Sequence, residues 1–335
     1  MKAIVVRQPG DPHVLRLEEI QDPAPGPGEV IVALQAAALN RRDLLVRSRA
    51  EWATHMPLVP GSDGAGHVAA VGPGVSNVKE GTPVVICPAL WWGPDESRPS
   101  SRFEILGGPT NGTYAQLVRV PAENVFPKPA HLSFEQAAAF PLAGLTAWRA
   151  LFTRARLKPG ERVLIPGVGS GVATFLVLLA KLAGARVYVT SGSPVKLERA
   201  RQLGVDGAAL YTDTDWAQQI ARQCGGGVEV AVDSVGAASF DQALHLLEPG
   251  GRLVTFGTTS GAELPFNLRP VYHKQLSILG TTMGTLKEFA ELLAAISTHR
   301  LQPIIDTLFP LSDAGQAHQR MQQREQFGKI VLKIE

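Results

Sequence analysis

The residues most clearly arranged for chemistry form a glycine-rich turn at Gly167, Gly169, Ser170 and Gly171, which lies between two apolar runs. Glycines let a backbone turn tightly and approach a diphosphate, and a helix that starts there offers N–H groups to the negative charge. Val172 stands where a strict Gly-x-Gly-x-x-Gly pattern has its third glycine. An ordinary strand-to-helix turn is the alternative, but the succession of strand, turn, helix and strand favours a dinucleotide site at these five residues.

The strand after this turn indicates which dinucleotide binds. NAD-binding domains place an Asp or Glu at its end for the ribose 2′-hydroxyl, whereas residues 186–190 lead into Ser191, with Lys196 a few positions later. No carboxylate repels a 2′-phosphate there and an ammonium can pair with one, so the sequence predicts NADP(H). A solvated helix residue is the alternative for Lys196. Tyr211 is expected to flank the adenosine, although simple packing explains it equally well.

Strands and helices alternate from residue 162 to residue 298. The predicted strands are 162–165, 186–190, 208–211, 228–233, 252–256 and 276–280, and the predicted helices are 172–182, 194–203, 216–223, 239–247 and 286–298. This alternation predicts an α/β domain with a parallel sheet covered on both faces. Ligands bind at the carboxyl ends of such strands, so Phe256, Gly257 and Ser260 join the expected cofactor contacts.

The first 120 residues have a different character. Short apolar runs at 3–6, 29–38, 66–71 and 83–87 are separated by Gly and Pro, which is typical of an all-β partial barrel. Ser133 and Gln136 form a capping-box pattern for a helix at 134–139, and a second helix is expected at 145–154. A helix at 314–323 and a final strand at 329–334 follow, and that strand is expected to return to the first region.

Composition excludes several classes of protein. The length of 335 residues suggests two domains, and 45% hydrophobic with 19% charged residues excludes a disordered chain. The formal charge of +2 gives no reason to expect a nucleic acid or a membrane surface as partner. No signal peptide or membrane span is recognisable. Cys87 and Cys224 are too few for a disulfide framework, so a reducing compartment, the cytoplasm, is expected.

Several segments together resemble the medium-chain dehydrogenase/reductase superfamily, in its zinc-free quinone-oxidoreductase-like branch. They are MKAIVV at the start, 38–48, 59–75, 111–129, 137–151, the glycine turn and 327–334, and they span essentially the whole chain. The resemblance implies a mainly β, chaperonin-10-like catalytic domain at 1–125 and 300–335 and a Rossmann domain at 126–299, with the active site in the cleft between them. It also implies a homodimer joined through edge strands, for which residues 276–280 are the candidate.

The resemblance also allows the question of zinc to be examined. Zinc-dependent members place a Cys where Asn40 stands and a His-Glu pair where Ser62 and Asp63 stand. A catalytic zinc needs three protein ligands, for which Asn and Ser are poor substitutes. The stretch 87–103, equivalent to a lobe with four cysteines, contains one. The sequence therefore predicts neither zinc, and His67 is expected to be a packed strand residue.

The resemblance assigns further site residues by position. Asn40 is expected to direct its amide at the nicotinamide or a substrate carbonyl, with a helix-capping role as the alternative. Asp63 is equally open between lining the pocket and packing. Thr146 matches a position near the nicotinamide, and its alternative is a hydroxyl bonded to the preceding helical turn. Lys329 resembles a C-terminal cofactor contact, or is a solvated charge.

These features predict an NADPH-dependent, zinc-independent reductase of quinones or α,β-unsaturated carbonyl compounds. Such reductions need less help than alcohol oxidation, because the negative charge delocalises onto a conjugated oxygen. An alcohol or aldehyde oxidoreductase with the same fold is one alternative. A non-enzymatic NADPH-binding protein of the crystallin type is another.

Overall fold

A computed structural model describes all residues, 1–335, and divides into two compact units. Unit 1 comprises Met1–Leu145 and Gly284–Glu335, and unit 2 comprises Thr146–Met283. The expected boundaries assigned residues 126–145 and 284–299 to the nucleotide domain, whereas here they belong to unit 1. The reason is aromatic packing: the Phe289 ring lies 4.9 Å from that of Phe126 and 5.8 Å from that of Phe140.

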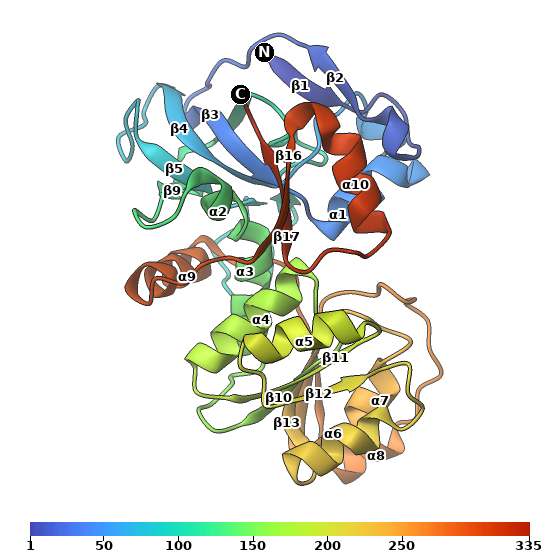
Figure 1. Cartoon of the computed structure of the whole chain (residues 1–335). Helices are drawn as coiled ribbons and strands as arrows, with labels where there is room; N and C mark the ends of the chain where they lie inside the picture. The colour runs from blue at the N-terminus through green and yellow to red at the C-terminus, as the bar shows by residue number, and fades with distance from the viewer. The chain divides into compact units, whose positions relative to one another are not determined.

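Unit 1 is mainly β. Its seven-stranded sheet has the order β16-β17-β3-β4-β5-β9, with β8 also paired to β3. These strands are β16 Ile305–Pro310, β17 Lys329–Lys333, β3 Glu29–Ala38, β4 Asp63–Val71, β5 Pro83–Ile86, β9 Val125–Pro127 and β8 Leu117–Pro121. Two small sheets pair β1 (Lys2–Val5) with β2 (Arg16–Glu19) and β6 (Ala89–Leu90) with β7 (Glu104–Ile105). The C-terminal strand β17 runs antiparallel to β3, which confirms the expected return of the chain (Figure 1).

The helices of unit 1 come from distant parts of the chain. They are α1 Arg41–Ser48, α2 Phe134–Ala138, α9 Leu286–Thr298 and α10 Ala314–Gln322, with 3-10 turns at Pro12–Val14, Ala50–His55, Ala122–Asn124 and Leu311–Asp313. The predicted capping box holds α2, since Ser133 Oγ accepts from the Gln136 N–H and Gln136 Oε1 accepts from the Ser133 N–H. Helix α1 is not among the predicted helices. Its start is fixed by Asp43, whose side chain accepts from the Asn40 N–H at 2.8 Å.

Unit 2 is a parallel six-stranded sheet with the order β12-β11-β10-β13-β14-β15. The strands are β12 Gly207–Leu210, β11 Arg186–Ser191, β10 Arg162–Ile165, β13 Val228–Asp233, β14 Leu247–Thr255 and β15 Ser277–Gly280. Its helices are α4 Gly171–Leu182, α5 Pro194–Gln202, α6 Trp216–Cys224, α7 Phe240–His245 and α8 Arg269–His273. The predicted fold class, an α/β Rossmann domain together with a mainly β chaperonin-10-like domain, is confirmed.

Two elements differ from expectation. The helix expected at 145–154 begins earlier, as α3 Pro141–Trp148, and continues as a π-helix at Arg149–Arg154. A proline is favourable in a first helical turn, where its missing N–H has no intrahelical partner. The strand expected at 252–256 begins earlier, because Leu247 already pairs with Val228; regular pairing resumes at Arg252 opposite Val230, after an irregular stretch that contains Gly250 with φ +76°.

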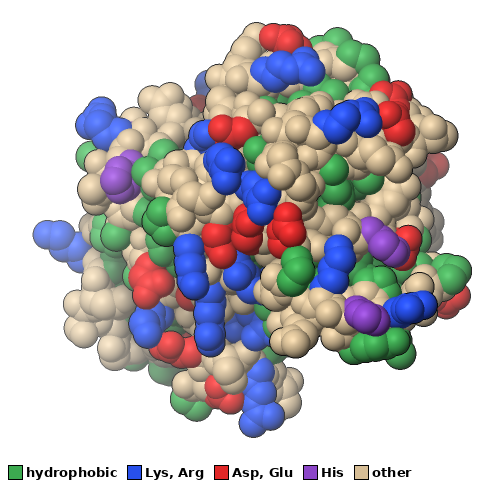
Figure 2. Space-filling model, turned by 90° about the horizontal axis from the view of Figure 1, so that it is seen from below, with side chains coloured by type: hydrophobic (Ala, Val, Ile, Leu, Met, Phe, Trp, Pro, Cys, Tyr) green, Lys and Arg blue, Asp and Glu red, His purple; other side chains and the backbone are tan.

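Basic and acidic side chains are intermixed on the face shown in Figure 2, in keeping with the small formal charge of +2. None of the helices combines the length and the apolar character that crossing a bilayer requires.

A buried histidine, His318 on α10, lies in the core of unit 1. Its ring meets the Tyr114 ring edge-on at 5.8 Å, and neither ring nitrogen has a hydrogen-bond partner. Burial, together with the charge of Arg47, lowers the pKa of His318 to about 3. Since an unfolded histidine binds its proton near pH 6.5, the unfolded state takes up more protons below that pH, and acidification destabilises the fold.

Asp43 acts in the opposite direction. Burial raises its pKa to about 6, although Arg42 and hydrogen bonds from Asn40 and Tyr114 lower it. The folded state therefore holds a proton on Asp43 that the unfolded state releases above its ordinary pKa of 3.8. Its contribution to stability falls as pH rises between about 4 and 6, whereas that of His318 rises over the same range.

Replacing His318 with Phe is expected to remove only the histidine contribution. Relative to wild type, His318→Phe should gain about 2 kcal/mol of unfolding free energy between pH 6.5 and pH 5, because each pH unit of differential proton binding is worth about 1.4 kcal/mol. Urea unfolding at the two pH values measures this. His299→Gln, at an exposed position, serves as the control and should show no such gain. Parallel pH profiles for His318→Phe and wild type would contradict this, because they would mean that His318 binds its proton equally in the folded and unfolded states.

Candidate active site

Unit 2 carries the glycine-rich turn at the carboxyl end of β10. Gly167 and Gly169 have φ of +71° and +123°, which side chains rarely adopt. A Cβ on Gly167 would lie 2.9 Å from Val235 Cγ2. Thr190 on the neighbouring strand holds the turn, since its carbonyl accepts from the Val168 N–H at 2.7 Å and its Oγ1 from the Gly167 N–H at 3.3 Å. The turn is thus a glycine-lined cradle in which backbone can approach a ligand closely.

Helix α4 starts directly from this cradle. Ser170 is its N-cap, and its Oγ accepts from the Ala173 N–H at 3.1 Å. The N–H groups of Gly171 and Val172 have no acceptor within the helix, because the first turn of any helix lacks one. Together with the helix dipole they suit an anionic group such as the diphosphate of a dinucleotide. These residues therefore fit the diphosphate of a dinucleotide.

The next strand, β11, ends at the second predicted contact region. Ser191 is buried, its Oγ accepts from the Ser193 N–H at 3.2 Å, and its carbonyl accepts from the Tyr211 N–H at 3.0 Å. Tyr211 is 47% exposed and lies so close to Gly192 that a Cβ there would approach its hydroxyl to 2.6 Å. Lys196 lies in the first turn of α5, where its N–H is 3.4 Å from Ser193 Oγ. The structure thus brings Ser191 and Tyr211 together.

The loops after β13 and β14 form the third contact region. Asp233 ends β13 and accepts from the Gly236 N–H at 2.9 Å and the Ser239 hydroxyl at 2.6 Å. Burial raises the pKa of Asp233. Ser260 joins the two loops, because its hydroxyl donates to the Val235 carbonyl at 2.7 Å and accepts from the Ala238 N–H at 3.0 Å. The sequence pattern indicated Ser260 but gave no reason to select Asp233, whose role in shaping the loop depends on its buried contacts.

The remaining predicted contacts of unit 2 are placed as follows. Phe256 is half-buried just beyond β14, and its N–H donates to the Asp233 carbonyl at 3.2 Å. Gly257 follows, where a Cβ would lie 3.0 Å from the Ser234 carbonyl oxygen. Thr146 on α3 is buried, with its hydroxyl 4.0 Å from Met283 Sδ. Because β10, β11, β13 and β14 are adjacent and parallel, the glycine turn, Ser191 and Phe256 share one edge of the sheet.

Unit 1 holds a separate cluster of buried polar groups around Lys329. Its ammonium donates to Asn40 Oδ1 at 2.7 Å and to Asp63 Oδ2 at 2.8 Å, and Asn40 Nδ2 donates to the same carboxylate oxygen at 2.9 Å. The side chains of Lys329 and Asp63 are 2% and 0% exposed. The other carboxylate oxygen of Asp63 accepts from the Leu142 N–H at 2.8 Å. The solvated-charge alternative for Lys329 is therefore wrong.

Strand register explains why these three residues meet. Val331 on β17 lies opposite Ala38 on β3, so the antiparallel ladder continued by two residues brings Lys329 opposite Asn40. Ala38 in turn lies opposite Asp63, the first residue of β4. The cluster therefore forms where three neighbouring strands begin or end. Spacing in the sequence gives no indication of this meeting, because Lys329 is 289 residues from Asn40.

A second group of contacts surrounds this cluster. Arg42 is half-buried and donates to Ser62 Oγ at 2.9 Å and to the carbonyls of Leu106 and Gly108, each at 3.1 Å. Burial lowers the pKa of Arg42. The Tyr114 hydroxyl donates to Asp43 at 2.9 Å. Sequence reasoning passed over Arg42 and Tyr114, because an Arg next to a helix start and a Tyr in a loop are common in structural roles.

The positions at which zinc-dependent relatives hold their metal do not fit a zinc ion in this chain. The side-chain oxygens of Asn40 and Asp63 already accept hydrogen bonds from the Lys329 ammonium. Ser62 Oγ accepts one from the Arg42 guanidinium. Zinc is held by thiolate, imidazole or carboxylate, and a second cation at the same oxygens would be repelled. No three His, Cys, Asp or Glu side chains gather in a way that could hold a metal ion. His67 packs against Phe134 with ring centroids 4.8 Å apart, as expected.

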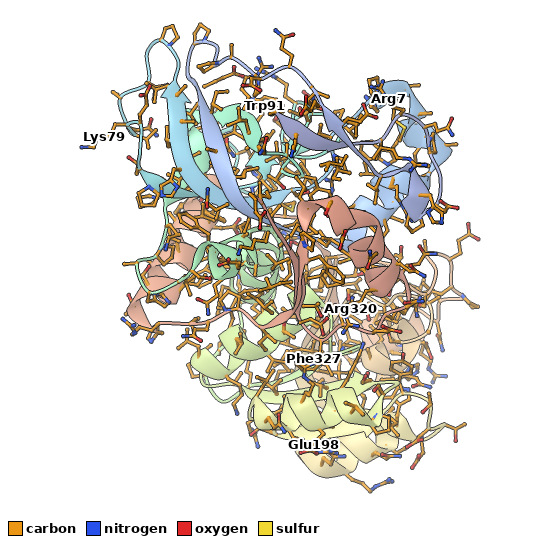
Figure 3. The ribbon with its side chains drawn as sticks, turned by 45° about the horizontal axis from the view of Figure 1, so that its top comes forward. Arg7, Lys79, Trp91, Glu198, Arg320 and Phe327 are labelled. Carbon is orange, nitrogen blue, oxygen red and sulfur yellow. The ribbon has the colours of Figure 1, made fainter.

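The remnant of the zinc lobe is filled by aromatic packing. Trp92 is buried against Phe103, with ring centroids 5.1 Å apart, and its Nε1 donates to the Asp95 carbonyl. Trp91, labelled in Figure 3, has the Arg102 guanidinium 5.8 Å from its ring centroid. Trp92 therefore helps to fill this segment from within.

The fold and these two sites define a nicotinamide-dependent oxidoreductase of the Rossmann type with a GroES-like partner domain. Two families match the chain: "Alcohol dehydrogenase GroES-like domain" over residues 26–130 and "Zinc-binding dehydrogenase" over residues 171–298. The chain belongs to the medium-chain dehydrogenase/reductase superfamily, as the resemblance implied.

Individual relatives agree with this membership. The chain is 34% identical to a zinc-type alcohol dehydrogenase-like protein, YogA, of Leptosphaeria maculans, covering 96% of this chain and 95% of that protein. It is 30% identical to a quinone oxidoreductase of Rattus norvegicus, covering 99% and 97%.

Solved structures agree as well. One described as an NAD-dependent alcohol dehydrogenase superposes with a TM-score of 0.94 at 40% identity over the full length of both chains. A crotonyl-CoA carboxylase/reductase, AntE, in complex with NADP superposes with a TM-score of 0.90 at 25% identity, covering 99% of this chain and 94% of that one (the V350A variant).

The buried pair of Lys329 and Asp63 is expected to be strongly coupled. Lys329→Met or Asp63→Asn alone should lower the unfolding free energy by about 3–5 kcal/mol, because either leaves a buried group without its partner. The double variant should lose less than the sum of the two. Chemical denaturation of the four proteins measures the coupling. The exposed pair of Lys287 and Glu96, with side chains 62% and 59% exposed, provides the control, and Lys287→Met should cost about 0.5 kcal/mol or less. Additive losses at Lys329 and Asp63 would contradict a coupled pair.

Proposed function

We propose that this protein is an NADPH-dependent, zinc-independent reductase of quinones or α,β-unsaturated carbonyl compounds. The proposal rests on the side chains at the positions where the resemblance places the metal ligands of zinc-dependent members. There the Lys329 ammonium donates hydrogen bonds to oxygens of Asn40 and Asp63. Alcohol dehydrogenation in this fold class uses a metal to stabilise an alkoxide. Reduction of a conjugated system spreads the charge over several atoms and needs only an oriented hydride and a hydrogen-bond donor.

The cofactor supplies a hydride when bound, and the residues of this chain hold and orient it. Gly167, Gly169 and the start of α4 bind the diphosphate, as their backbone geometry suits. For an enone the balanced reaction consumes one NADPH and one proton and releases NADP and the saturated ketone. For a quinone it releases NADP and the hydroquinone. Asn40, Asp63 and Thr146 are proposed to act on the reacting groups, and Lys329 is proposed to contact the cofactor or the substrate.

The proposed preference for NADPH rests on the residues at the end of β11. Ser191 stands where NAD-binding domains carry an acid, and Lys196 follows on α5. The structural relatives do not decide this point, since one is described as NAD-dependent and another binds NADP. We therefore propose NADP(H) on the residues of this chain.

A quinone and enone panel tests the reaction directly. After metal removal with EDTA and desalting, the protein should still oxidise NADPH with at least one member of a panel containing 9,10-phenanthrenequinone and trans-2-hexenal. Added ZnCl₂ should not raise the rate. Turnover that disappears with the metal and returns with zinc would contradict the proposal. NADPH binding with no turnover of any panel member would favour the non-enzymatic alternative.

An alcohol or aldehyde oxidoreductase is the second candidate, because several relatives carry the name alcohol dehydrogenase. Oxidation of primary and secondary alcohols with NADP or NAD belongs in the same panel. If an alcohol is turned over faster than every quinone and enone, this second candidate replaces the first.

Fluorescence titration with both cofactors tests the role of Lys196. Wild type should bind NADPH at least 10-fold more tightly than NADH, and Lys196→Ala should lose most of that ratio, since a hydrogen bond to a charged group contributes about 1.5–3 kcal/mol. NADH binding itself should change little. Lys158→Ala, at an exposed position outside the predicted contacts, should keep the wild-type ratio. An unchanged ratio in Lys196→Ala would remove Lys196 from the 2′-phosphate site.

We further propose a homodimer joined through β15, the edge strand of the unit 2 sheet. An unpaired strand edge is a template for pairing with a second copy. Ile278 on this strand is 39% exposed, and Leu268 and Tyr272 nearby in sequence are 64% and 67% exposed. Sedimentation velocity should show a dimer for wild type and a monomer for Ile278→Lys; a wild-type monomer would refute the proposal.

Because Cys87 and Cys224 are both free thiols, we propose the cytoplasm as the compartment.

A further inference from the structure

Unit 1 contains a pocket that shares no lining residue with the candidate active site. The pocket has a volume of about 570 Å³ and lies between the 3-10 turn at Pro12–Val14 and helix α10. Its lining residues come from two segments, 11–16 and 312–323. Helix α10, red in Figure 1, lies beside α1 in this unit.

Local contacts hold the two segments of the pocket together. Asp11 starts the 3-10 turn, because its Oδ1 accepts from the His13 N–H at 3.0 Å. Gly315 lets α10 approach this turn closely, since a Cβ there would lie 3.2 Å from the Pro12 carbonyl oxygen. Leu15 follows the turn and is 9% exposed. The two walls of the pocket are therefore fixed by the fold.

Three charged side chains line the pocket without neutralising one another. They belong to Asp11, Arg16 and Asp313, and none of them forms an ion pair. One oxygen of Asp11 caps its turn, and one oxygen of Asp313 accepts from the adjacent Ser312 hydroxyl at 3.3 Å. The second oxygen of each carboxylate and the Arg16 guanidinium are left for other partners. The pocket thus offers positive and negative charge at separate places.

Amide groups form the wall of the pocket on the α10 side. Gln316, Gln319 and Gln323 follow one another at spacings of three and four residues, which places them on one face of the helix and its C-cap. A glutamine amide both donates and accepts hydrogen bonds. These three residues, the glutamine wall, therefore offer donors and acceptors to a polar ligand.

A buried positive charge lies behind this side of the pocket. Arg47 on α1 is 3% exposed and donates from Nη2 to Gln322 Oε1 at 3.4 Å, and Gln322 lines the pocket. Burial lowers the pKa of Arg47, whereas the charge of Asp11 opposes this change, so the guanidinium and that carboxylate are close enough to interact. Arg47 therefore helps to balance the two carboxylates of the pocket.

We propose that this pocket binds a free α-amino acid with a polar side chain. Arg16 donates to the carboxylate of the ligand, since guanidinium groups match carboxylates in geometry and charge. Asp11 and Asp313 accept from its ammonium, and the glutamine wall bonds to its side chain. A simple anion would face two carboxylates and a simple cation would face Arg16, so a ligand that carries both charges fits best. The proposal is independent of the proposed reaction, because none of these residues belongs to the candidate active site.

A pocket that holds only solvent is the competing explanation, and it makes different predictions. Solvated charges would give no saturable binding, and removing one charge from a ligand would change nothing. A specific site requires both charges of the ligand at once. Its occupation would also raise the thermal stability of the folded protein by mass action.

The experiment titrates the whole chain by calorimetry with L-glutamine, L-asparagine and L-serine. We expect one-to-one binding of at least one of them, with a Kd of about 1 mM or lower and a rise in Tm. Two modified forms of the tightest binder then test each charge separately, since its N-acetyl derivative lacks the ammonium and its methyl ester lacks the carboxylate. Each modified form should bind about 10-fold more weakly or worse, because a hydrogen bond between charged groups is lost.

Two variants assign these charges to residues of the pocket. Arg16→Gln should weaken binding of the amino acid about 10-fold or more but leave binding of its methyl ester unchanged, since the ester has no carboxylate to lose. Asp313→Asn should likewise weaken binding of the amino acid and spare the N-acetyl derivative. Arg98→Gln and Glu123→Gln, at exposed positions outside the pocket, are the controls and should bind as wild type does.

Three results would overturn the proposal. They are the absence of saturable binding of all three amino acids up to about 10 mM, equal binding of the amino acid and both of its modified forms, and wild-type affinity in Arg16→Gln. If Arg16→Gln does not fold, the three forms of the ligand on wild type carry the test alone. Turnover of quinones or enones plays no part in these measurements, so a failure here is distinguishable from a failure of the proposed function.

Discussion

A buried ion pair between Lys329 and Asp63 governs much of the architecture of unit 1. Moving two charges out of water is costly, so such a pair persists only where geometry and further hydrogen bonds compensate. Here Asn40 and the Leu142 N–H supply the additional bonds. The pair requires β17 to lie beside β3, and β3 beside β4, at fixed register. Strand β17 thus completes both the sheet and the polar cluster.

The candidate ligand site of unit 2 is built differently from the polar cluster of unit 1. This site consists of backbone rather than side-chain charge, namely glycines with positive φ and the first N–H groups of α4, which Ser170 caps. Side-chain hydrogen bonds to the backbone stabilise the loops themselves, and they come from Thr190, Asp233 and Ser260. These contacts fix the loops at the carboxyl edge of the parallel sheet, the edge at which ligands bind in sheets of this kind.

Much of the fold could be predicted because its signals are local. The strands at 29–38, 162–165 and 228–233 and the helix at 286–298 coincide with β3, β10, β13 and α9, since hydrophobic periodicity and Gly or Pro boundaries determine them. The glycine turn was predicted for the same reason. The division of the helical segment into α3 and a π-helix was missed, because a π-helix has no clear local pattern. The early start of β14 was missed because Gly250 is typical of a turn.

The polar cluster could be predicted only in part. Asn40, Asp63 and Lys329 were each selected by their positions in the family's motifs, but their contact is a property of three-strand register across 289 residues of sequence. The buried roles of Arg42, Tyr114 and Asp233 depend in the same way on tertiary contacts. Residues whose function lies in long-range pairing give little sign of it in a single sequence.

The central claim is that this chain transfers a hydride to a conjugated carbon without a metal. It can be tested with metal-stripped protein, NADPH deuterated at C4 on either face, and trans-2-hexenal, which offers both a C=C and a C=O bond. Nuclear magnetic resonance of the product locates the deuterium. The account predicts deuterium on the β-carbon of hexanal. Deuterium on the carbinol carbon of hexenol would contradict it and identify the protein as an alcohol dehydrogenase in its chemistry.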